Sequence, residues 1–389
     1  MKGIVNIILR ELKFIFKSKL YISALIIFPI VDILFLGGIY VSQTLNKLPI
    51  TVIDNDNSKI SKNIVRYFNA CPDMEVKTRV SNVYELQELF NKQKSVLGLY
   101  IPKNFQKDIK RQKSPSVTLF VNASNYISGN ITDSDSTTIL SIINAGIRSS
   151  LLTKKGIYKQ QVKDLLQPVR IDSEKLFNPS LNYNFYLTPG IWLSVIHQFL
   201  ILIGVLTLST EFDLKTIYSL IKKSKRSLLI MFLGKMLVYL AFVFIHFEIL
   251  YLAMFRLFNI PVLHSNKDII IYSMCFAFAS MSFGMFLAAL LKTRLNALKG
   301  CLLFSAPAFL LSGYTWPLDQ MPYLLRNAVH ILPLTSFLEG FRKIYQQNVS
   351  IEYTYCFMKE LLVLGLIYFL LSYIFMYFRI KKYEKKYEN

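Results

Sequence analysis

The chain has 389 residues, of which 53% are hydrophobic and 14% aromatic, and its formal net charge is +21. This composition is too apolar for an ordinary soluble protein, and the basic residues lie beside apolar runs rather than in a nucleic-acid-binding patch, so we expect no nucleic-acid partner. The four cysteines form no metal-type or redox pair in sequence, which argues against a disulfide framework and leaves open only a bridge between Cys71 and Cys356.

Residues 1–19 predict an amphipathic helix that lies on the membrane surface. Apolar residues recur there at helical spacing, and Arg10, Lys13 and Lys17 lie elsewhere on the same helix. The apolar positions are Ile4, Ile7, Ile8, Leu12, Ile15 and Phe16. The apolar run that follows is long enough to cross a bilayer, and no small-residue cleavage site of the usual kind follows it, so this is no cleavable signal peptide.

Six apolar segments are long enough, or nearly so, to cross a hydrocarbon core, which takes about 20 helical residues. They are residues 20–41, 190–209, 228–255, 269–291, 297–315 and 361–378. The fold class that follows is an α-helical polytopic membrane protein with six transmembrane helices. Residues 42–189 form an inserted extracytoplasmic domain, residues 190–380 the rest of the transmembrane domain, and residues 381–389 a tail.

The distribution of lysine and arginine predicts the orientation of these spans. Basic residues gather in residues 1–19, in the loops after the second and fourth spans, and in the tail, whereas the loop after the third span has only Arg256 and Lys267. Loops rich in lysine and arginine stay in the cytoplasm. We therefore expect a multi-pass protein of the inner (cytoplasmic) membrane with both termini in the cytoplasm and residues 42–189 outside.

The inserted segment alternates between strand and helix patterns, which favours an α/β layer. Strands are predicted at residues 50–53, 75–80, 96–101 and 116–122. The predicted helices are residues 58–69 capped by Ser58, a helix through Lys92 capped by Ser81, and a short helix that starts at Pro102. Residues 116–167 contain no proline and predict one or two long helices at the C-terminal end of this domain.

This domain contains no histidine and no evident catalytic constellation. Asp54 and Asp56 are residue types that bind metals on loops, but we favour a role for them in a turn and at a helix N-terminus. The same interpretation holds for Asp133 and Asp135. We therefore predict neither a catalytic nor a metal site.

Asp32 lies within the first predicted span, His197 within the second, and His246 and Glu248 within the third. A charged residue at the centre of a spanning helix costs about 2.5–3.5 kcal/mol, so such residues are functional candidates. One interpretation is that these four line a substrate path. The other is that they pair with each other or with serine and tyrosine hydroxyls inside the bundle.

The segment from Ser312 to Arg342 is too broken for one spanning helix and too apolar for a solvated loop. Pro317, Pro322 and Pro333 each interrupt helical continuation. Irregular backbone survives beside a bilayer only where protein or an aqueous cavity covers it. We predict short helices that dip toward the membrane and return, with an inert lipid-facing cap as the alternative.

Four segments of the chain together resemble a known family. They are the strand–turn–helix pattern of Leu48–Ser61, the Asn-Pro and Pro-Gly pairs of Phe177–Gly190, the acidic and then basic pattern of Glu211–Lys235, and Ser312–Arg342. In this order and spacing they resemble the membrane subunits of type-2 ABC transporters, in the branch with a large external domain after the first span. Each motif is weak by itself, but together they cover nearly the whole chain.

The resemblance implies roles for two of these segments. Residues 211–225 would form a cytoplasmic coupling helix in a cleft of a separate ATPase, with Phe212, Ile217, Leu220 and Ile221 as apolar anchors; the alternative is that these side chains rest on the membrane surface. The implied coupling residues are Glu211, Phe212, Asp213, Thr216 and Leu220. The implied outer-gate residues are Ser312, Gly313, Pro317, Met321, Pro322, Pro333, Thr335 and Arg342. Lys215 and Asp213 depart from the family pattern, which usually has glycine and glutamate there.

The chain also lacks the phosphate-binding loop G-x-x-x-x-G-K-[ST], because Gly234-Lys235 is followed by Met236 and has no upstream glycine. We therefore expect the permease subunit of an ATP-driven exporter and no enzyme, with ATP and magnesium bound by the partner ATPase. Other expected partners are a second permease copy or a sister permease, membrane lipid, and a periplasmic adaptor where export crosses two membranes. The alternatives are a membrane-anchored external binding or scaffold protein, and a secondary transporter, which would usually show two related halves. The substrate stays open.

Overall fold

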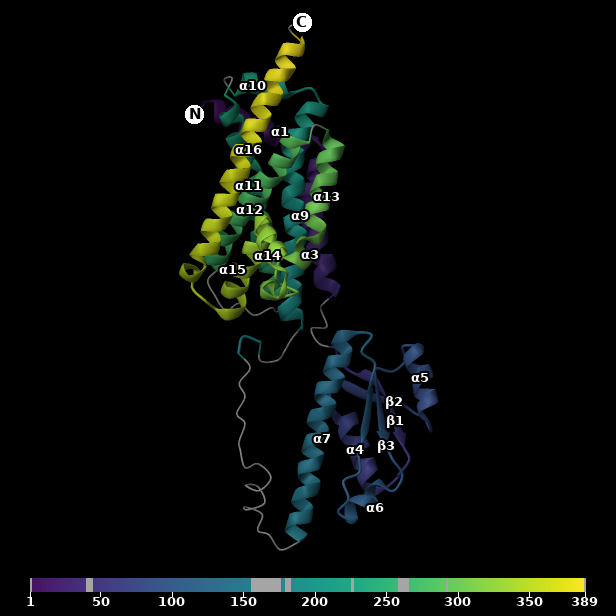
Figure 1. The fold of residues 1–389 in the computed structure, drawn as a ribbon. Coiled ribbons are helices and arrows are strands. Elements are labelled where there is room, and N and C mark those ends of the chain that lie inside the picture. The colour runs from purple at the N-terminus through teal and green to yellow at the C-terminus, as the bar shows by residue number, and fades with distance from the viewer. Residues whose placement is uncertain are drawn as a thin grey trace. The chain divides into compact units, whose positions relative to one another are not determined.

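The computed structural model describes residues 2–39, 45–154, 176–178, 183–224, 227–257, 266–291 and 293–387. The chain divides into two compact units: a helical bundle made of Met1–Gln43 and Lys175–Asn389, and a unit made of Thr44–Glu174, which we call the external unit after its predicted location (Figure 1). A membrane protein with an inserted α/β domain is therefore confirmed as the fold class. Residues 40–41 of the predicted first span, and Pro179 and Ser180 of the Asn-Pro motif region, lie outside the described residues.

Six helices of the bundle are long and apolar enough to cross a membrane, as the sequence predicts. They are Lys19–Gly38, Phe185–Asp213, Leu228–Leu257, Lys267–Leu290, Arg294–Leu311 and Ile351–Lys381. The first span runs through α2 (Lys19–Ile22), η1 (Ser23–Ile27) and α3 (Phe28–Ile39). The second belongs to α9 (Tyr183–Asp213), and the third to α11 (Leu228–Leu252) with η2 (Ala253–Leu257). The fourth, fifth and sixth belong to α12 (Asn266–Leu290), to α13 (Arg294–Leu311), and to η5 (Ile351–Thr354) with α16 (Tyr355–Tyr387). The second helix begins earlier than predicted, so Pro189 lies inside it.

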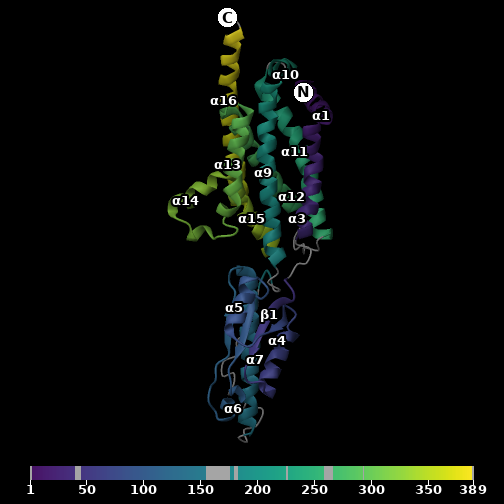
Figure 2. The ribbon, with the colours of Figure 1, turned by 90° about the vertical axis from the view of Figure 1, so that its right-hand side faces the viewer.

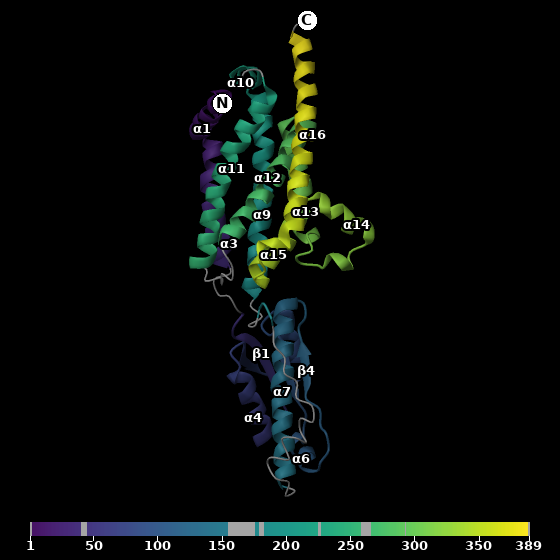
Figure 3. The ribbon, with the colours of Figure 1, turned by 90° about the vertical axis from the view of Figure 1, so that its left-hand side faces the viewer.

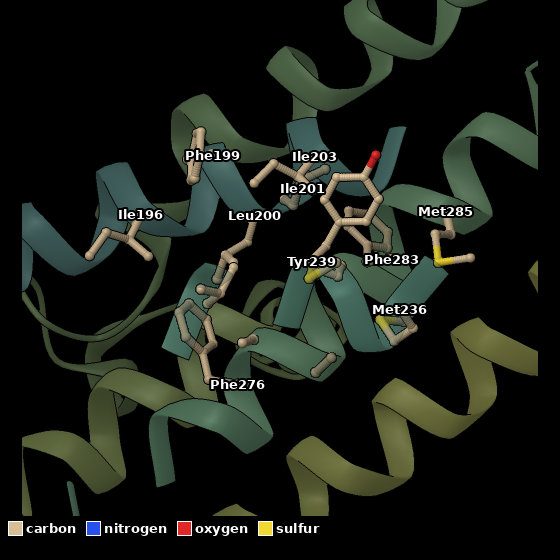
Figure 4. Close-up of a cluster of buried hydrophobic side chains, with 14 of the residues drawn as sticks. Ile196, Phe199, Leu200, Ile201, Ile203, Met236, Tyr239, Phe276, Phe283 and Met285 are labelled. Carbon is tan, nitrogen blue, oxygen red and sulfur yellow. The ribbon is translucent and has the colours of Figure 1, made fainter. Parts of the chain in front are cut away.

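The core of the bundle lies where α12 packs against α9 and α16. Figure 4 shows Ile196, Leu200 and Phe276 at this contact. Two glycines bring the backbones of α9 and α12 together: a Cβ on Gly204 would lie 2.3 Å from the Met281 carbonyl oxygen, and one on Gly284 would lie 2.1 Å from the Ile201 carbonyl oxygen. Small residues permit such close helix packing in membranes, where no hydrophobic effect drives helices together.

Helix α1 (Lys2–Lys17) precedes the first span and lies at the same end of the bundle as the short helix α10 (Ile217–Lys223) (Figure 1). We call this the α1 end. Ile7, Glu11 and Ile15 of α1 face the bundle and are fully buried. Arg10 is nearly buried as well, so it does not lie on a solvated polar face as the amphipathic pattern suggests. The packing is close, because a Cβ on Gly234 of α11 would lie 2.7 Å from Ile7 Cγ2.

The external unit is a four-stranded sheet with the strand order β2-β1-β3-β4. Its strands are β1 (Leu48–Asp54), β2 (Met74–Arg79), β3 (Leu97–Ile101) and β4 (Thr118–Val121). β1 is parallel to β2 and β3, and β4 pairs antiparallel with β3. Helices α4 (Lys59–Ala70), α6 (Phe105–Lys110) and α7 (Tyr126–Lys154) enclose one hydrophobic core with the sheet, and α5 (Val83–Asn91) lies on the other side (Figure 1).

Local sequence signals predicted the positions of most of these elements. Ser58 caps α4 by accepting a hydrogen bond from the Ser61 amide, as predicted. Asn82, not Ser81, caps α5, because its side chain accepts from the Glu85 amide. The short helix starts at Phe105 rather than at Pro102.

The predicted turn and cap roles hold for one pair of aspartates and not for the other. Asp54 Oδ1 accepts from the amides of Asp56 and Asn57, and Asp56 Oδ2 accepts from the Gln106 amide. Asp133 and Asp135 instead lie inside α7, so their predicted turn or cap role is wrong.

The end of the bundle opposite α1 carries the broken segment. It folds as η3 (Leu318–Gln320), α14 (Tyr323–Ala328), η4 (Val329–Ile331) and α15 (Pro333–Gln347), which agrees with the predicted short helices. Figures 2 and 3 show α14 projecting sideways from the bundle. Its flanks are anchored in the bundle, since Ser312 and Thr335 are fully buried, whereas Trp316, Tyr323 and Leu324 are exposed.

Candidate functional site

The end of α9 is the point where the predicted coupling segment meets the bundle. α9 ends at Asp213, and α10 begins at Ile217, so residues 211–225 are not one helix as expected. Lys215 has a φ of 54° at this break. A residue with a Cβ is strained in this left-handed region, where glycine is the usual choice. The turn is therefore formed even though Lys215 replaces the glycine that the family pattern favours.

Glu211, in the last turn of α9, is buried and joins three other elements. Arg10 of α1 binds its carboxylate with both terminal nitrogens, and the distance from Nη2 to Oε2 is 2.8 Å. Lys235 of α11 donates from Nζ to Oε1 at 2.8 Å. Thr216, at the start of α10, donates from Oγ1 to Oε2 at 2.5 Å. One carboxylate thus holds α1, α10 and α11 together.

Glu11 of α1 completes this arrangement from the other side. Its Oε1 lies 2.9 Å from Lys235 Nζ and also contacts Arg10, while Tyr239 donates its hydroxyl to Oε2 at 3.3 Å. Glu11 and Lys235 have 0% and 1% of their surfaces exposed. We call Arg10, Glu11, Glu211 and Lys235 the charge cluster. Its two cations and two anions cancel, which permits four charges in an apolar bundle.

The protonation state of Arg10 follows from its neighbours. Burial alone would lower the pKa of Arg10, but the hydrogen bond to Glu211 and the charges of Glu11 and Glu211 raise that pKa above its ordinary value. Arg10 therefore stays charged and forms a bidentate pair with Glu211, a geometry that fixes orientation as well as distance.

The two residues after Glu211 connect α9 to the remaining helices at this end. The Arg379 guanidinium of α16 lies 3.7 Å from the centroid of the Phe212 ring and donates to the Ala288 carbonyl of α12 at 3.0 Å. Asp213 lies 3.6 Å from Arg294 of α13. Three consecutive side chains of α9 thus contact α1, α11, α13 and α16.

Helix α10 presents a different face to solvent than the sequence suggests. Ile217 and Leu220, two of the expected anchors, are buried against the bundle. The exposed apolar side chains near this turn are Leu214, with 53% of its surface exposed, and Tyr218, with 39%. In this structure, Ile217 and Leu220 hold α10 to the bundle, and Leu214 and Tyr218 are apolar side chains that a partner can reach.

Sequence reasoning missed Arg10, Glu11, Lys235 and Tyr239 as members of the site. A weak signal was present, since Glu11 lies among the apolar residues of an amphipathic helix and Lys235 lies within an apolar run. A charge in such a place needs a partner of opposite sign. The pattern cannot say which partner, because Arg10 and Glu211 are separated by 201 positions.

The intramembrane candidates are not brought together. His197 is fully buried beside Phe276 of α12, with ring centroids 5.6 Å apart. His246 of α11 packs on Phe199, on another side of α9. Within the described part of the chain, neither ring nitrogen of His197 has a hydrogen-bond partner, nor do His246 Nε2 and Asp32 Oδ2. The expected pairing of these groups with each other or with hydroxyls is therefore not seen at these atoms, and Glu248 lies on the exposed face of α11.

The outer-gate candidates lie in an exposed segment, residues 315–328, which we call the lobe, and in the two segments that anchor it to the bundle on either side. Gly313 has a φ of 80°, a turn that suits glycine. Beside it, Tyr186 donates its hydroxyl to the Tyr314 carbonyl at 2.5 Å, and Tyr314 returns a hydrogen bond to the Tyr186 carbonyl. A Cβ on Gly190 would lie 2.4 Å from the Tyr314 ring, so the Pro-Gly motif of α9 packs directly on the residue that follows the Ser-Gly motif.

The second anchor lies beyond the lobe. Pro333 starts α15, and Thr335 donates from Oγ1 to the Val329 carbonyl at 2.8 Å. His330 Nδ1 lies 3.0 Å from Glu360 Oε1 of α16. Pro317 and Pro322 are exposed in the lobe between the anchors, while Met321 there and Arg342 on α15 are half-buried.

Comparison with known proteins places these features in one family. Residues 19–378 match the model of the ABC-2 family transporter proteins. The chain is 22% identical over 365 residues to a protein named probable multidrug ABC transporter permease YbhR from Escherichia coli K12, with 92% of this chain and 94% of that protein covered. It is 21% identical over 363 residues to the linearmycin resistance permease protein LnrN of Bacillus subtilis strain 168, with 90% and 93% covered.

The inner membrane transport permease YhhJ of Escherichia coli K12 is 22% identical over 379 residues, and 96% of each chain is covered. The family model covers the inserted domain and the six spans, apart from the last three residues of the sixth span. The chain therefore belongs to the ABC-2 transporter family and is a permease subunit of an ABC transporter.

Proposed function

We propose that this permease forms the path for export, and that a separate ATPase supplies the energy. The end of α9 would transmit the movements of that ATPase to the spans. The observation that supports this most is the junction at Glu211, Phe212 and Asp213, which connects α10 to α1, α11, α13 and α16. A partner that moves α10 would move the turn that orients these helices. ATP and magnesium would be bound by that partner.

The docking surface that we propose is the exposed side of the α9–α10 turn. Leu214 and Tyr218 supply apolar contact area there, and Lys215 and Lys222 add positive charge. In this arrangement the α1 end and both termini face the cytoplasm, and the external unit lies outside the cytoplasmic membrane. The concentration of lysine and arginine at the α1 end supports this orientation.

A second permease subunit, identical or a sister chain, would complete the path. Leu302, Leu303 and Leu310 are exposed on α13, which leaves an apolar face for such a partner. Asp32, His197 and His246 carry polar atoms without partners in the described bundle, so they remain our candidates for the path, and residues 312–342 remain our candidate for the outer gate.

A periplasmic adaptor would join where export crosses a second membrane. The names of YbhR and LnrN suggest that the exported compound is a drug-like or antibiotic molecule.

The test is co-purification of the ATPase with the tagged chain from its native cell. We expect Leu214→Asp and Tyr218→Asp to lose the ATPase, because each places a charge in an apolar contact. Tyr84→Asp is a matched control on an exposed tyrosine of the external unit, and it should retain the partner. Retention of the ATPase by all three variants would show that this surface is not the coupling site.

A further inference from the structure

An apolar groove lies between α1 and the middle of α11. It has a volume of about 360 Å³, and Ile8, Leu12, Leu237, Val238, Ala241, Phe242 and Ile245 line it. Every lining side chain is a hydrocarbon, so the groove offers nothing to a polar solute or an ion. Its volume is in the range of small-molecule sites, which is about 300–1,000 Å³.

The surface around this groove has the polarity of a bilayer interface. Leu9 and Phe16 of α1 are more than half exposed, at 54% and 58%, and the Phe16 ring packs 6.3 Å from the Phe242 ring beside the groove. Lys13 and Lys17 are exposed on α1. Lys13 follows Leu12, so it projects about 100° further around the helix, away from the buried face that carries Glu11. The helix therefore presents an apolar stripe with a basic flank.

From this juxtaposition we propose that the groove binds one acyl chain of an anionic phospholipid, whose headgroup meets Lys13 and Lys17. A bilayer supplies acyl chains at high concentration, and basic residues at its surface attract anionic headgroups. An acyl chain matches this groove between α1 and α11, because hydrocarbon side chains alone line it.

A lipid bound there would act on the charge cluster. Leu12 and Val238, two residues of the groove, adjoin Glu11 and Tyr239, which hydrogen bond to each other. An acyl chain in the groove fills the space beside this contact and holds α1 against α11. The lipid would thus set the position of the helix that carries Arg10 and Glu11.

The experiment is native mass spectrometry of the purified chain in detergent, titrated with phosphatidylglycerol and, separately, with phosphatidylcholine. We expect one phosphatidylglycerol to be retained at higher affinity than phosphatidylcholine. Ala241→Trp fills the groove with an indole and should abolish this retained lipid. Ile249→Trp, on the exposed face of the same helix but outside the groove, should keep it.

Two further variants separate the headgroup from the acyl chain. Lys13→Gln and Lys17→Gln should each weaken phosphatidylglycerol by about fivefold and leave phosphatidylcholine unchanged, since one basic residue near a membrane surface contributes at about that level. Equal retention of the two lipids by the unmodified chain, or unchanged retention by Ala241→Trp, would overturn the proposal. The measurement needs no ATPase, so its result is independent of the coupling proposed above.

Discussion

At the α1 end, single buried residues carry charges that are balanced only by their neighbours. Lys235 lies between Glu11 and Glu211, at 2.9 and 2.8 Å, and nearly all of its surface is buried. A buried ion pair contributes little net stability compared with apolar residues of similar volume, but removal of one partner leaves the other charge uncompensated. The stability of the charge cluster therefore depends on its balance rather than on any one contact.

This balance predicts the effect of Lys235→Met. The variant leaves two carboxylates facing one arginine, so we expect a loss of about 3–5 kcal/mol in the free energy of unfolding. The measurement is denaturant unfolding of the purified chain in micelles. Lys299→Met removes an exposed lysine and should change little. Addition of Glu11→Gln to Lys235→Met should restore part of the loss, and a double variant no more stable than the single one would contradict the balance argument.

At the scale of elements, the break between α9 and α10 sets the direction of the segment that a partner would contact. Lys215 adopts a left-handed conformation there, and the Thr216 amide donates to the Glu211 carbonyl at 2.9 Å. The turn is therefore closed by its own backbone and by the Thr216 side chain. Its sequence does not favour it, because lysine has no advantage at a positive φ.

Lys215→Gly should consequently stabilise the chain. Relief of the left-handed strain outweighs the added freedom of glycine in the unfolded chain, and we expect a gain of about 0.5–1 kcal/mol. Thermal unfolding of the purified protein measures it. Lys222→Gly, inside α10, is the matched control and should cost about 1 kcal/mol. Equal destabilisation by both substitutions would show that the turn does not set the conformation of residue 215.

At the scale of the whole molecule, the chain consists of two units with separate hydrophobic cores. The core of the external unit includes Val52, Phe68, Leu99 and Phe105, and it draws on the sheet and on helices α4, α6 and α7. All of these elements lie between residues 48 and 154, so the core needs no side chain of the bundle. A segment with its own core and sheet meets the ordinary definition of a domain.

Residues 45–154 should therefore fold when they are expressed without the bundle. We expect one cooperative thermal transition by circular dichroism. Phe68→Ala should lower the free energy of unfolding by about 3–5 kcal/mol, because Phe68 is fully buried, whereas Tyr84→Ala, on an exposed side chain, should change it by about 0.5 kcal/mol or less. If the isolated segment showed no cooperative thermal transition, its core would depend on the bundle.

The sequence alone determined the features that are coded locally. The length of each apolar run sets the number of spans, since a helix that crosses a bilayer must satisfy its own backbone within one segment. Ser58 could be identified as a cap because capping takes place within four residues. The inserted α/β domain followed from strand and helix patterns read one element at a time, and the family resemblance followed from motifs in their order.

The tertiary structure decided what depends on contacts between distant residues. Arg10 looks like part of a solvated basic face in sequence, but it binds Glu211 on another helix. Leu220 looks like an anchor for a partner, but it is fully buried in its own bundle. Helical periodicity shows that a residue lies on a given face of its helix, and it contains no information on what that face meets. The charge cluster and the apolar groove both join α1 to residues more than 200 positions further along the chain, so only the folded chain brings them together.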